Sequence, residues 1–418
     1  MAADRSRYVW DGLRRQRLDK PYVRANGHGD GKLQPASWGE AFAAVAAVVK
    51  DLGKDAGDDI AAVAGDLAPV EAVWALKGLM DGLGSNRYDC RQDGAALPAG
   101  NRSGYVGNAR IEDIDASRAI LIVGSNPRLE APVLNSRIRK AWINGADVAV
   151  VGAPVDLTYE HHHLGTGPKA LQGESRSKIV DYMKAKENPL IILGLGALTR
   201  ADGAAVLGHA MAMAGEIGAK LLVLHTAAGR VGAMDVGFTC EGGLKSALPG
   251  AKLVFNLGAD EIDMPDGAFV VYQGSHGDRG AHRADVILPG AAYTEQSGIY
   301  VNTEGRPQRA DRAGFPPGDA REDWAVLRAL SAELGKTLPF DSLSQLRAGL
   351  FEAHPHLSAL DQVPVNDWTP VAAGAMTEAP FASAVTDHYL VNPVARASEV
   401  MAEQSRLAVE RNRALAAE

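Results

Sequence analysis

Cysteine is nearly absent from this chain of 418 residues, which contains only Cys90 and Cys240. A cubane iron–sulfur cluster normally takes about four thiolates from closely spaced motifs, so this sequence cannot supply its ligands. We expect both cysteines to be reduced, because an isolated disulfide is unusual in a reducing compartment.

Long apolar runs are missing as well. The apolar stretches Ala119–Val123 and Leu190–Leu193 are far shorter than the roughly 20 residues that a membrane-spanning helix needs. The N-terminus carries charge without a following apolar region, which predicts no secretory signal. The sequence therefore favours a soluble chain without direct membrane insertion.

Runs of positive charge are also absent. The 43 Lys and Arg residues are outnumbered by 51 Asp and Glu residues, which gives a net charge of −8. This balance argues against broad nucleic-acid binding. With 46% hydrophobic and 22% charged residues, the composition is that of a globular protein. The length allows two or three domains with sizeable cores.

Short apolar segments alternate with helical stretches along the chain, which predicts an α/β fold. The predicted strands are continuously apolar, as in parallel sheets that helices cover on both faces. They occupy residues 59–65, 119–124, 147–152, 189–194, 220–224, 252–258, 268–272 and 284–289. The predicted helices occupy residues 69–80, 132–143, 202–217, 319–334 and 342–351, with a charged helix from about residue 393.

The order of these elements predicts two Rossmann-like parallel-sheet half-domains in tandem, followed by a helical tail. We place the lead segment, the two half-domains and the linker with its docking tail at 1–36, 37–185, 186–362 and 363–418. Parallel sheets bind ligands beyond the carboxyl ends of their strands. The loops after Gly124 and Gly258 are therefore expected to face a shared cleft.

Three motifs are similar to known signatures but fit simpler interpretations better. The glycine loop at 194–199 has Thr199 in place of the third glycine of a dinucleotide loop, so NAD binding is not expected. Adjacent residues of an extended segment point to opposite faces, so the histidine run at 161–163 cannot converge on one metal ion. The Ser-His-Asp sequence within 275–278 shares one loop, whereas a hydrolytic triad draws its members from separate loops.

Two loops at strand ends remain as candidates for holding a ligand. The turn 125–127 precedes a helix whose free N–H groups can bind an anion, although a purely structural turn explains it equally well. The loop after residue 289 is too long and too polar for a simple hairpin. The polar residues that we single out as a candidate site are Ser125, Asn126, His276, Asp285, Glu295, Asn302 and Glu304. We assign no catalytic and no metal-binding residue.

Segments spread over nearly the whole chain carry a family resemblance. They read WDGLRRQRL at 10–18, NPRLEAP at 126–132, NSRIRK at 135–140, PVDLTY at 154–159, YQGSHGD at 272–278, ADVILPG at 284–290, GAAYTE at 290–295 and NTEGR at 302–306. Together they resemble the molybdopterin oxidoreductase superfamily. The closer resemblance is to the family of large iron–sulfur subunits (G-type subunits) of NADH:quinone oxidoreductase, respiratory complex I.

The resemblance has implications for cofactors. In the superfamily two Rossmann-like halves bind the guanine-nucleotide arms of a molybdopterin cofactor. The resemblance also implies that the N-terminal region that holds one 2Fe–2S and 4Fe–4S clusters in this family is missing, so none is expected here. Cys90 falls in the loop where true molybdoenzymes place a metal ligand, but its neighbours at 91–94 do not resemble such a motif. We therefore expect a vestigial molybdopterin site.

The role implied by the resemblance is a cofactor-free scaffold in the peripheral arm of complex I, in contact with its other subunits. Its implied place is the cytoplasmic face of the bacterial inner membrane, or the matrix side in a mitochondrion. The basic segments 14–17 and 137–140 are candidate contacts for that packing, or solvated helix faces. The alternative is a molybdopterin-dependent oxidoreductase that retains its cofactor at the seven candidate residues.

Overall fold

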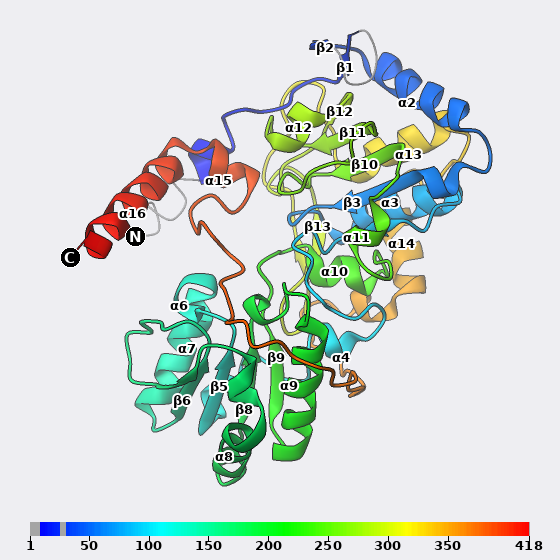
Figure 1. Ribbon diagram of the computed structural model, residues 1–418. Coiled ribbons are helices and arrows are strands. Elements are labelled where there is room, and N and C mark those ends of the chain that lie inside the picture. The colour runs from blue at the N-terminus through cyan, green and yellow to red at the C-terminus, as the bar shows by residue number, and fades with distance from the viewer. Residues whose placement is uncertain (1–8, 26–30, 418) are drawn as a thin grey trace.

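A computed structural model describes residues 9–25 and 31–417 and shows two lobes, each built around its own sheet (Figure 1). The large lobe comprises residues 9–107 and 225–360, and the small lobe comprises residues 108–224. A tail from residue 361 runs across both lobes (Figure 1). The predicted α/β fold class is confirmed.

The sheet of the large lobe has the strand order β2-β1-β12-β11-β10-β3-β4. The strands from β12 to β4 are parallel, whereas β1 is antiparallel to both of its neighbours. Ile60, Ala62 and Ala64 of β3 join the core on one face, and Ala61 and Val63 join the core on the other. This two-sided burial explains the continuous apolar runs. The strands are β1 Tyr22–Arg24, β2 Leu33–Pro35, β3 Ile60–Ala64, β4 Tyr88–Asp89, β10 Leu253–Leu257, β11 Phe269–Gly274 and β12 Val286–Pro289.

Helices cover both faces of this sheet, with α2, α3 and α13 on one face and α11 and α12 on the other. Ser37 begins α2 with a capping box, in which its hydroxyl accepts from the Glu40 backbone N–H and the Glu40 carboxylate accepts from the Ser37 N–H. The helices of this lobe are α2 Trp38–Leu52, α3 Val70–Gly82, α4 Arg102–Tyr105, α10 Arg230–Asp235, α11 Leu244–Ala247, α12 Arg279–Arg283, α13 Asp323–Glu333 and α14 Leu343–Ala353. Short 3-10 turns occupy Ala56–Asp59 and Pro355–Ser358.

The small lobe is a five-stranded parallel sheet in the order β7-β6-β5-β8-β9. Its central strand β5 is buried along its whole length. The strands are β5 Ala119–Val123, β6 Asp147–Val151, β7 His162–Gly165, β8 Leu190–Leu193 and β9 Lys220–Val223. The helices are α5 Asp113–Ala116, α6 Pro127–Glu130, α7 Pro132–Ile143, α8 Gly173–Lys184 and α9 Gly203–Ile217, with 3-10 turns at Pro168–Leu171 and Leu195–Ala197.

This sheet order corrects the predicted division into consecutive half-domains at 37–185 and 186–362. The boundary at 185 would cut the small-lobe sheet between β7 and β8, although β8 lies directly beside β5. Strand β3 lies next to β10, which follows it by almost 200 residues, in the sheet of the large lobe. The small lobe is therefore an insertion between two segments of the large lobe, and strand periodicity alone does not encode this pairing.

The loop after residue 289 is longer than a simple hairpin, as expected, because residues 290–297 precede its first strand. It contains a two-stranded antiparallel hairpin of β13, Gly298–Val301, and β14, Pro307–Ala310. Asn302 shapes the turn, because its side-chain carbonyl accepts from the backbone N–H groups of Glu304 and Arg306. The hairpin strands β13 and β14 were not predicted. Nor were the edge strands β2, β4 and β7, or the strand β1, which lies between β2 and β12.

The tail has no regular structure between residues 363 and 392 and ends in α15, Pro393–Ala397, and α16, Glu399–Ala417. The buried Phe381 donates its N–H to the Thr166 carbonyl, which holds the tail on the small lobe. Asp11 accepts hydrogen bonds from the Glu399 N–H and the Ser398 hydroxyl, so the two ends of the described chain lie together (Figure 1). Within the described residues no helix is long and apolar enough to cross a membrane.

The sheet order predicts which fragment of the chain folds alone. We expect residues 108–226 to form a cooperatively folded unit, because they contain every strand of the small-lobe sheet. The fragment 37–185 should stay unfolded, because it lacks β8 and β9. Circular dichroism and thermal melting of both fragments test this prediction. A cooperative transition for 37–185, with none for 108–226, would contradict it.

Candidate functional site

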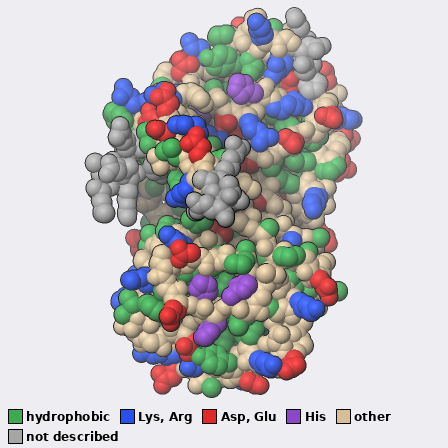
Figure 2. All heavy atoms as spheres, turned by 60° about the vertical axis from the view of Figure 1, so that its left-hand side comes forward, with side chains coloured by type: hydrophobic (Ala, Val, Ile, Leu, Met, Phe, Trp, Pro, Cys, Tyr) green, Lys and Arg blue, Asp and Glu red, His purple; other side chains and the backbone are tan. Residues whose placement is uncertain are grey.

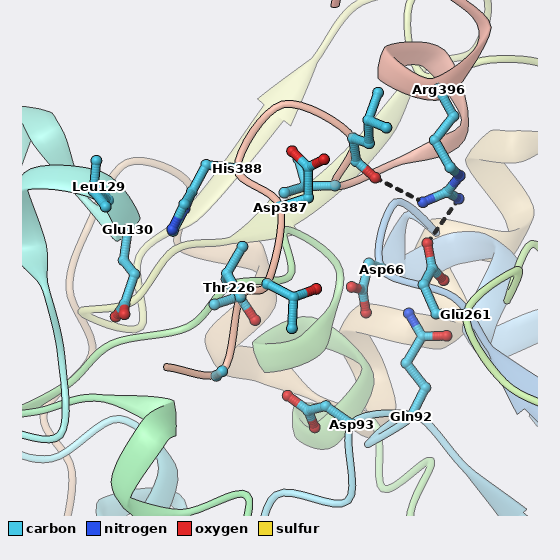
Figure 3. Close-up of a pocket in the computed structure, with 15 residues that line it drawn as sticks. Asp66, Gln92, Asp93, Leu129, Glu130, Thr226, Glu261, Asp387, His388 and Arg396 are labelled. Atoms are coloured by element: carbon cyan, nitrogen blue, oxygen red, sulfur yellow. Dashed lines mark hydrogen bonds and ion pairs between the residues drawn. The ribbon is translucent and has the colours of Figure 1, made fainter. Parts of the chain in front are cut away.

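A cleft of about 400 Å³ lies between the lobes, where strands of both sheets end. Asp66 follows β3, Glu261 follows β10, and Glu130 follows β5 across the gap. This is the edge at which parallel sheets bind ligands. The tail passes through the same place, and its residues from 384 to 396 complete the lining (Figure 3). The expectation of a shared cleft between strand-end loops agrees with this geometry.

The side chains that line the cleft are mainly acidic. The carboxylates come from both lobes and the tail, and they are Asp66, Asp93, Glu130, Glu261 and Asp387. Burial raises the pKa of Asp66 to about 6, although the neighbouring Arg230 opposes the shift. Burial and the nearby Asp278 also raise the pKa of Asp260 to about 6. Extra negative charge is therefore unfavourable at this edge.

Two arginines partly balance these carboxylates. Arg230 is fully buried behind the cleft, where it donates to Asp93 at 2.7 Å and lies 3.7 Å from Asp66. Arg396 of α15 donates to Glu261 at 2.8 Å and to Asp278 at 2.5 Å, and the first of these bonds is drawn in Figure 3. Both cations thus already pair with carboxylates of the protein, although the buried Nε and Nη2 of Arg230 have no hydrogen-bond partner among the described residues.

The residues present do not fit a molybdopterin with nucleotide arms. Its phosphates would meet the acidic lining just described, where both arginines are already engaged by carboxylates. On the large-lobe side, Pro393 and Val394 of the tail close the strand ends and leave a cavity of only about 50 Å³. Ligand pockets for molecules of this class are on the order of 300–1,000 Å³. The acidic lining of the cleft therefore disfavours an anionic cofactor, and the tail closes the strand ends on the large-lobe side.

Ser125 and Asn126 are the predicted site residues that lie beside this cleft, where both bond Glu130 of its lining. The Ser125 hydroxyl and the Asn126 backbone N–H both donate to the carboxylate of Glu130, at 2.5 and 3.2 Å. Glu130 thus occupies the start of the helix where an anion was expected. The turn is closed by the protein's own carboxylate.

His276 and Glu295 lie elsewhere and hold the N-terminal segment. The buried His276 ring lies 3.0 Å from the Gly12 carbonyl through Nε2 and 2.8 Å from the Ser275 hydroxyl through Nδ1. Glu295 accepts both guanidinium arms of Arg17, at 2.6 and 2.5 Å. Such a buried bidentate ion pair strongly fixes the position of the N-terminal segment. These residues stabilise chain packing rather than a ligand.

Asp285, Asn302 and Glu304 also bond the protein's own loops. The buried Asp285 accepts from the Val270 N–H at 2.8 Å and lies 3.4 Å from the Arg24 guanidinium. Glu304 accepts from the Ile111 N–H of the small lobe at 2.8 Å, so it joins the two lobes. The seven predicted residues therefore do not converge on one site. Glu295, Asn302 and Glu304 thus bond other parts of the protein itself.

The basic segments that were expected to contact other proteins also make internal pairs. Arg15 pairs with Asp11 at 2.6 Å, and Arg137 pairs with Asp115 at 2.5 Å.

Residues that the sequence analysis missed include Asp66, Asp93 and Glu261. Each follows a strand of the parallel sheet within a few residues, so attention to every strand end would have found them. Arg230 and Arg396 gave no such signal, because their partners are distant in sequence and only the folded chain brings them together.

Cys90 is poorly suited to bind a metal. It is buried, and burial together with the Asp89 carboxylate raises the pKa of its thiol well above the ordinary value. A metal ligand must be the thiolate. Histidine side chains gather on the surface of the small lobe (Figure 2), and His162 and His163 lie on the exposed strand β7. Among the described residues, no group of three or more His, Cys, Asp or Glu side chains has an arrangement that could hold a metal ion.

Comparisons with known proteins agree with this architecture. A family model described as molybdopterin oxidoreductase matches residues 17–333. A second model, for the C-terminal segment of the G-type subunit of NADH-ubiquinone oxidoreductase, matches residues 361–404. This second match covers the part of the tail that lines the cleft.

Curated relatives match almost the entire chain. The mitochondrial NADH dehydrogenase [ubiquinone] iron-sulfur protein 1 of Solanum tuberosum is 39% identical over 97% of this chain and 56% of its own length. The mitochondrial NADH-ubiquinone oxidoreductase 78 kDa subunit of Neurospora crassa is 39% identical over 96% of this chain and 57% of its own length. The chain thus spans a little over half the length of these relatives.

Solved structures share the fold at low identity. Acetylene hydratase from Pelobacter acetylenicus superposes with a TM-score of 0.54 and 13% identity, over 84% of this chain and 66% of that one. A chain of the formyltransferase/hydrolase complex from Methylorubrum extorquens gives 0.51 and 15%, over 76% of this chain and 99% of that one.

The buried His276 predicts a defined loss of stability in acid. Burial lowers its pKa from 6.5 to about 4, so between these pH values the unfolded chain binds the additional proton. The stability that the neutral His276 ring contributes is fully present above pH 6.5 and is lost as the pH falls toward 4. When the pH falls from about 7.5 to about 5, the unfolding free energy of the wild type should decrease by about 2 kcal/mol more than that of His276→Gln. Denaturant titrations measure this difference, with the exposed His282→Gln as control. An equal loss in all three proteins would refute the assignment.

Thiol reactivity tests the description of Cys90. At about pH 8, iodoacetamide should modify the partly exposed Cys240 first and reach Cys90 only after unfolding, because a buried neutral thiol reacts slowly. Peptide mapping of the alkylated protein measures the order. Rapid labelling of Cys90 in the folded protein would show a reactive thiolate.

Proposed function

Because the chain belongs to the molybdopterin oxidoreductase family, and its tail matches the G-type segment of NADH-ubiquinone oxidoreductase, we propose that it acts as a cofactor-free scaffold in that enzyme. In this proposal it is the molybdopterin-oxidoreductase-like part of the large iron–sulfur subunit of respiratory complex I. It lies in the peripheral arm and contacts other subunits of that arm.

The observation that carries this proposal is the acidic cleft that the tail crosses. Enzymes of the superfamily hold anionic nucleotide arms between their lobes. Here the corresponding edge carries five carboxylates and is crossed by the tail. The tail residues that close it fall within the segment that matches the G-type subunits. The chain keeps the fold of the family, but the tail crosses the strand ends where ligands would bind. This combination supports a structural role.

In the whole enzyme, electrons from NADH reach quinone through a flavin and iron–sulfur clusters. The two cysteines of this chain cannot hold such a cluster. Its contribution is therefore to bury the sides of neighbouring domains and to fix their spacing. The proposed location is peripheral, on the cytoplasmic face of the bacterial inner membrane or on the matrix side in a mitochondrion. The names of the curated relatives support this assignment.

A tagged chain purified from its source organism tests the proposal. It should migrate on native gels with NADH dehydrogenase activity and contain neither molybdenum nor tungsten in stoichiometric amount. The reason is that a scaffold remains bound to its assembly and offers no site for the metal. A free chain with one molybdenum or tungsten atom per molecule would contradict the proposal and favour a molybdopterin-dependent oxidoreductase.

A matched pair of variants links the tail to assembly. Arg396→Ala removes the ion pairs that hold α15 to Glu261 and Asp278. Because these pairs are only partly buried, the loss of stability should stay below the value of about 3–5 kcal/mol that truncating one partner of a buried pair costs. We expect faster proteolysis of the tail and a reduced yield of the assembled enzyme. The exposed Arg110→Ala, outside both basic segments, serves as control. If both variants gave the same yield of assembled enzyme, the position of the tail would not matter for assembly, and this prediction would be wrong.

A further inference from the structure

A small cavity within the large lobe lies apart from the inter-lobe cleft. Its volume is about 50 Å³, and it lies where β10 and β11 end, beside the first turn of α13. Pro393 and Val394 of the tail close it. A space of this size holds a few particles as large as a water molecule.

A buried carboxylate lines this cavity. Asp323 accepts hydrogen bonds from the side-chain amides of Gln273, at 2.9 Å, and of Gln296, at 3.0 Å. Among the ion pairs of the described residues, none joins Asp323 to a Lys, Arg or His side chain. The neighbouring Glu322 adds a second negative charge, which pairs with Arg312 instead.

An unsatisfied acceptor lines the same cavity. Gln273 is 4% exposed, and its side-chain carbonyl oxygen has no hydrogen-bond partner among the described residues. Its amide nitrogen donates to both the backbone carbonyl and the carboxylate of Asp323, which fixes the orientation of the amide. The oxygen is therefore left without a donor, and a buried acceptor in this state needs one.

The balance of charge indicates what fills the cavity. One carboxylate and a neutral amide oxygen match a single positive charge, whereas a divalent ion would leave excess positive charge and an anion would be repelled. We propose that the cavity binds a small monovalent cation, such as potassium, sodium or ammonium, through Asp323 and the Gln273 carbonyl. Burial raises the pKa of Asp323 to about 6, while the hydrogen bonds from Gln273 and Gln296 oppose this shift, and a cation beside the carboxylate would further favour its ionised form.

Melting of the full chain in different salts tests the proposal. At about pH 7.5 and equal ionic strength, the melting temperature should be about 2 °C or more higher in potassium, sodium or ammonium chloride than in choline chloride, because choline is too large for the cavity. Asp323→Asn should abolish this difference. The exposed Glu333→Gln, on the same helix, should retain it.

A second variant keeps the test decisive if Asp323→Asn does not fold. Gln273→Met removes the carbonyl ligand, so half-maximal stabilisation should need about tenfold more cation. Crystals soaked in rubidium should show an anomalous peak between the two side chains. Equal melting in choline and alkali salts, or an ion response that Asp323→Asn retains, would overturn the proposal and leave water or a proton as the occupant.

Discussion

The ion pairs of Arg396 hold the tail against the large lobe, and the closed form of the cleft depends on them. Asp260 and Glu261 follow β10 and Asp278 follows β11, so three carboxylates gather at one edge of the sheet. Without a cation among them, these groups would repel one another. Because Arg396 belongs to the same short helix as Pro393, pairing its guanidinium also seats the tail over the strand ends.

In this arrangement, the strand ends at which such folds bind ligands instead hold the tail against the lobes. The strands of both sheets still end at a common gap, as in a nucleotide-binding fold. The groups at those ends now bind one another, as when Glu130 occupies the helix start behind Ser125. Fold and function are therefore separable here. The shape of a cofactor enzyme persists, while the edge between its lobes is acidic and is crossed by the tail.

The sequence predicted the fold class and most central strands, because β3, β5 and β10 are buried on both faces and read as continuous apolar runs. It could not predict which strands pair. The inserted small lobe was therefore divided wrongly at residue 185. Candidate residues such as His276 were recognised as unusual polar groups, but their partners in the N-terminal segment are distant in sequence. The acidic cleft depends on such distant contacts, and so it became visible only in the folded chain.

The most direct test of this account is an experimental structure of the chain within its native assembly, at a resolution that identifies the occupant of the cleft. The account predicts that residues 384–396 fill the gap between the lobes and that Arg396 contacts Glu261 and Asp278. A molybdopterin nucleotide bound between the lobes, with the tail displaced, would contradict it.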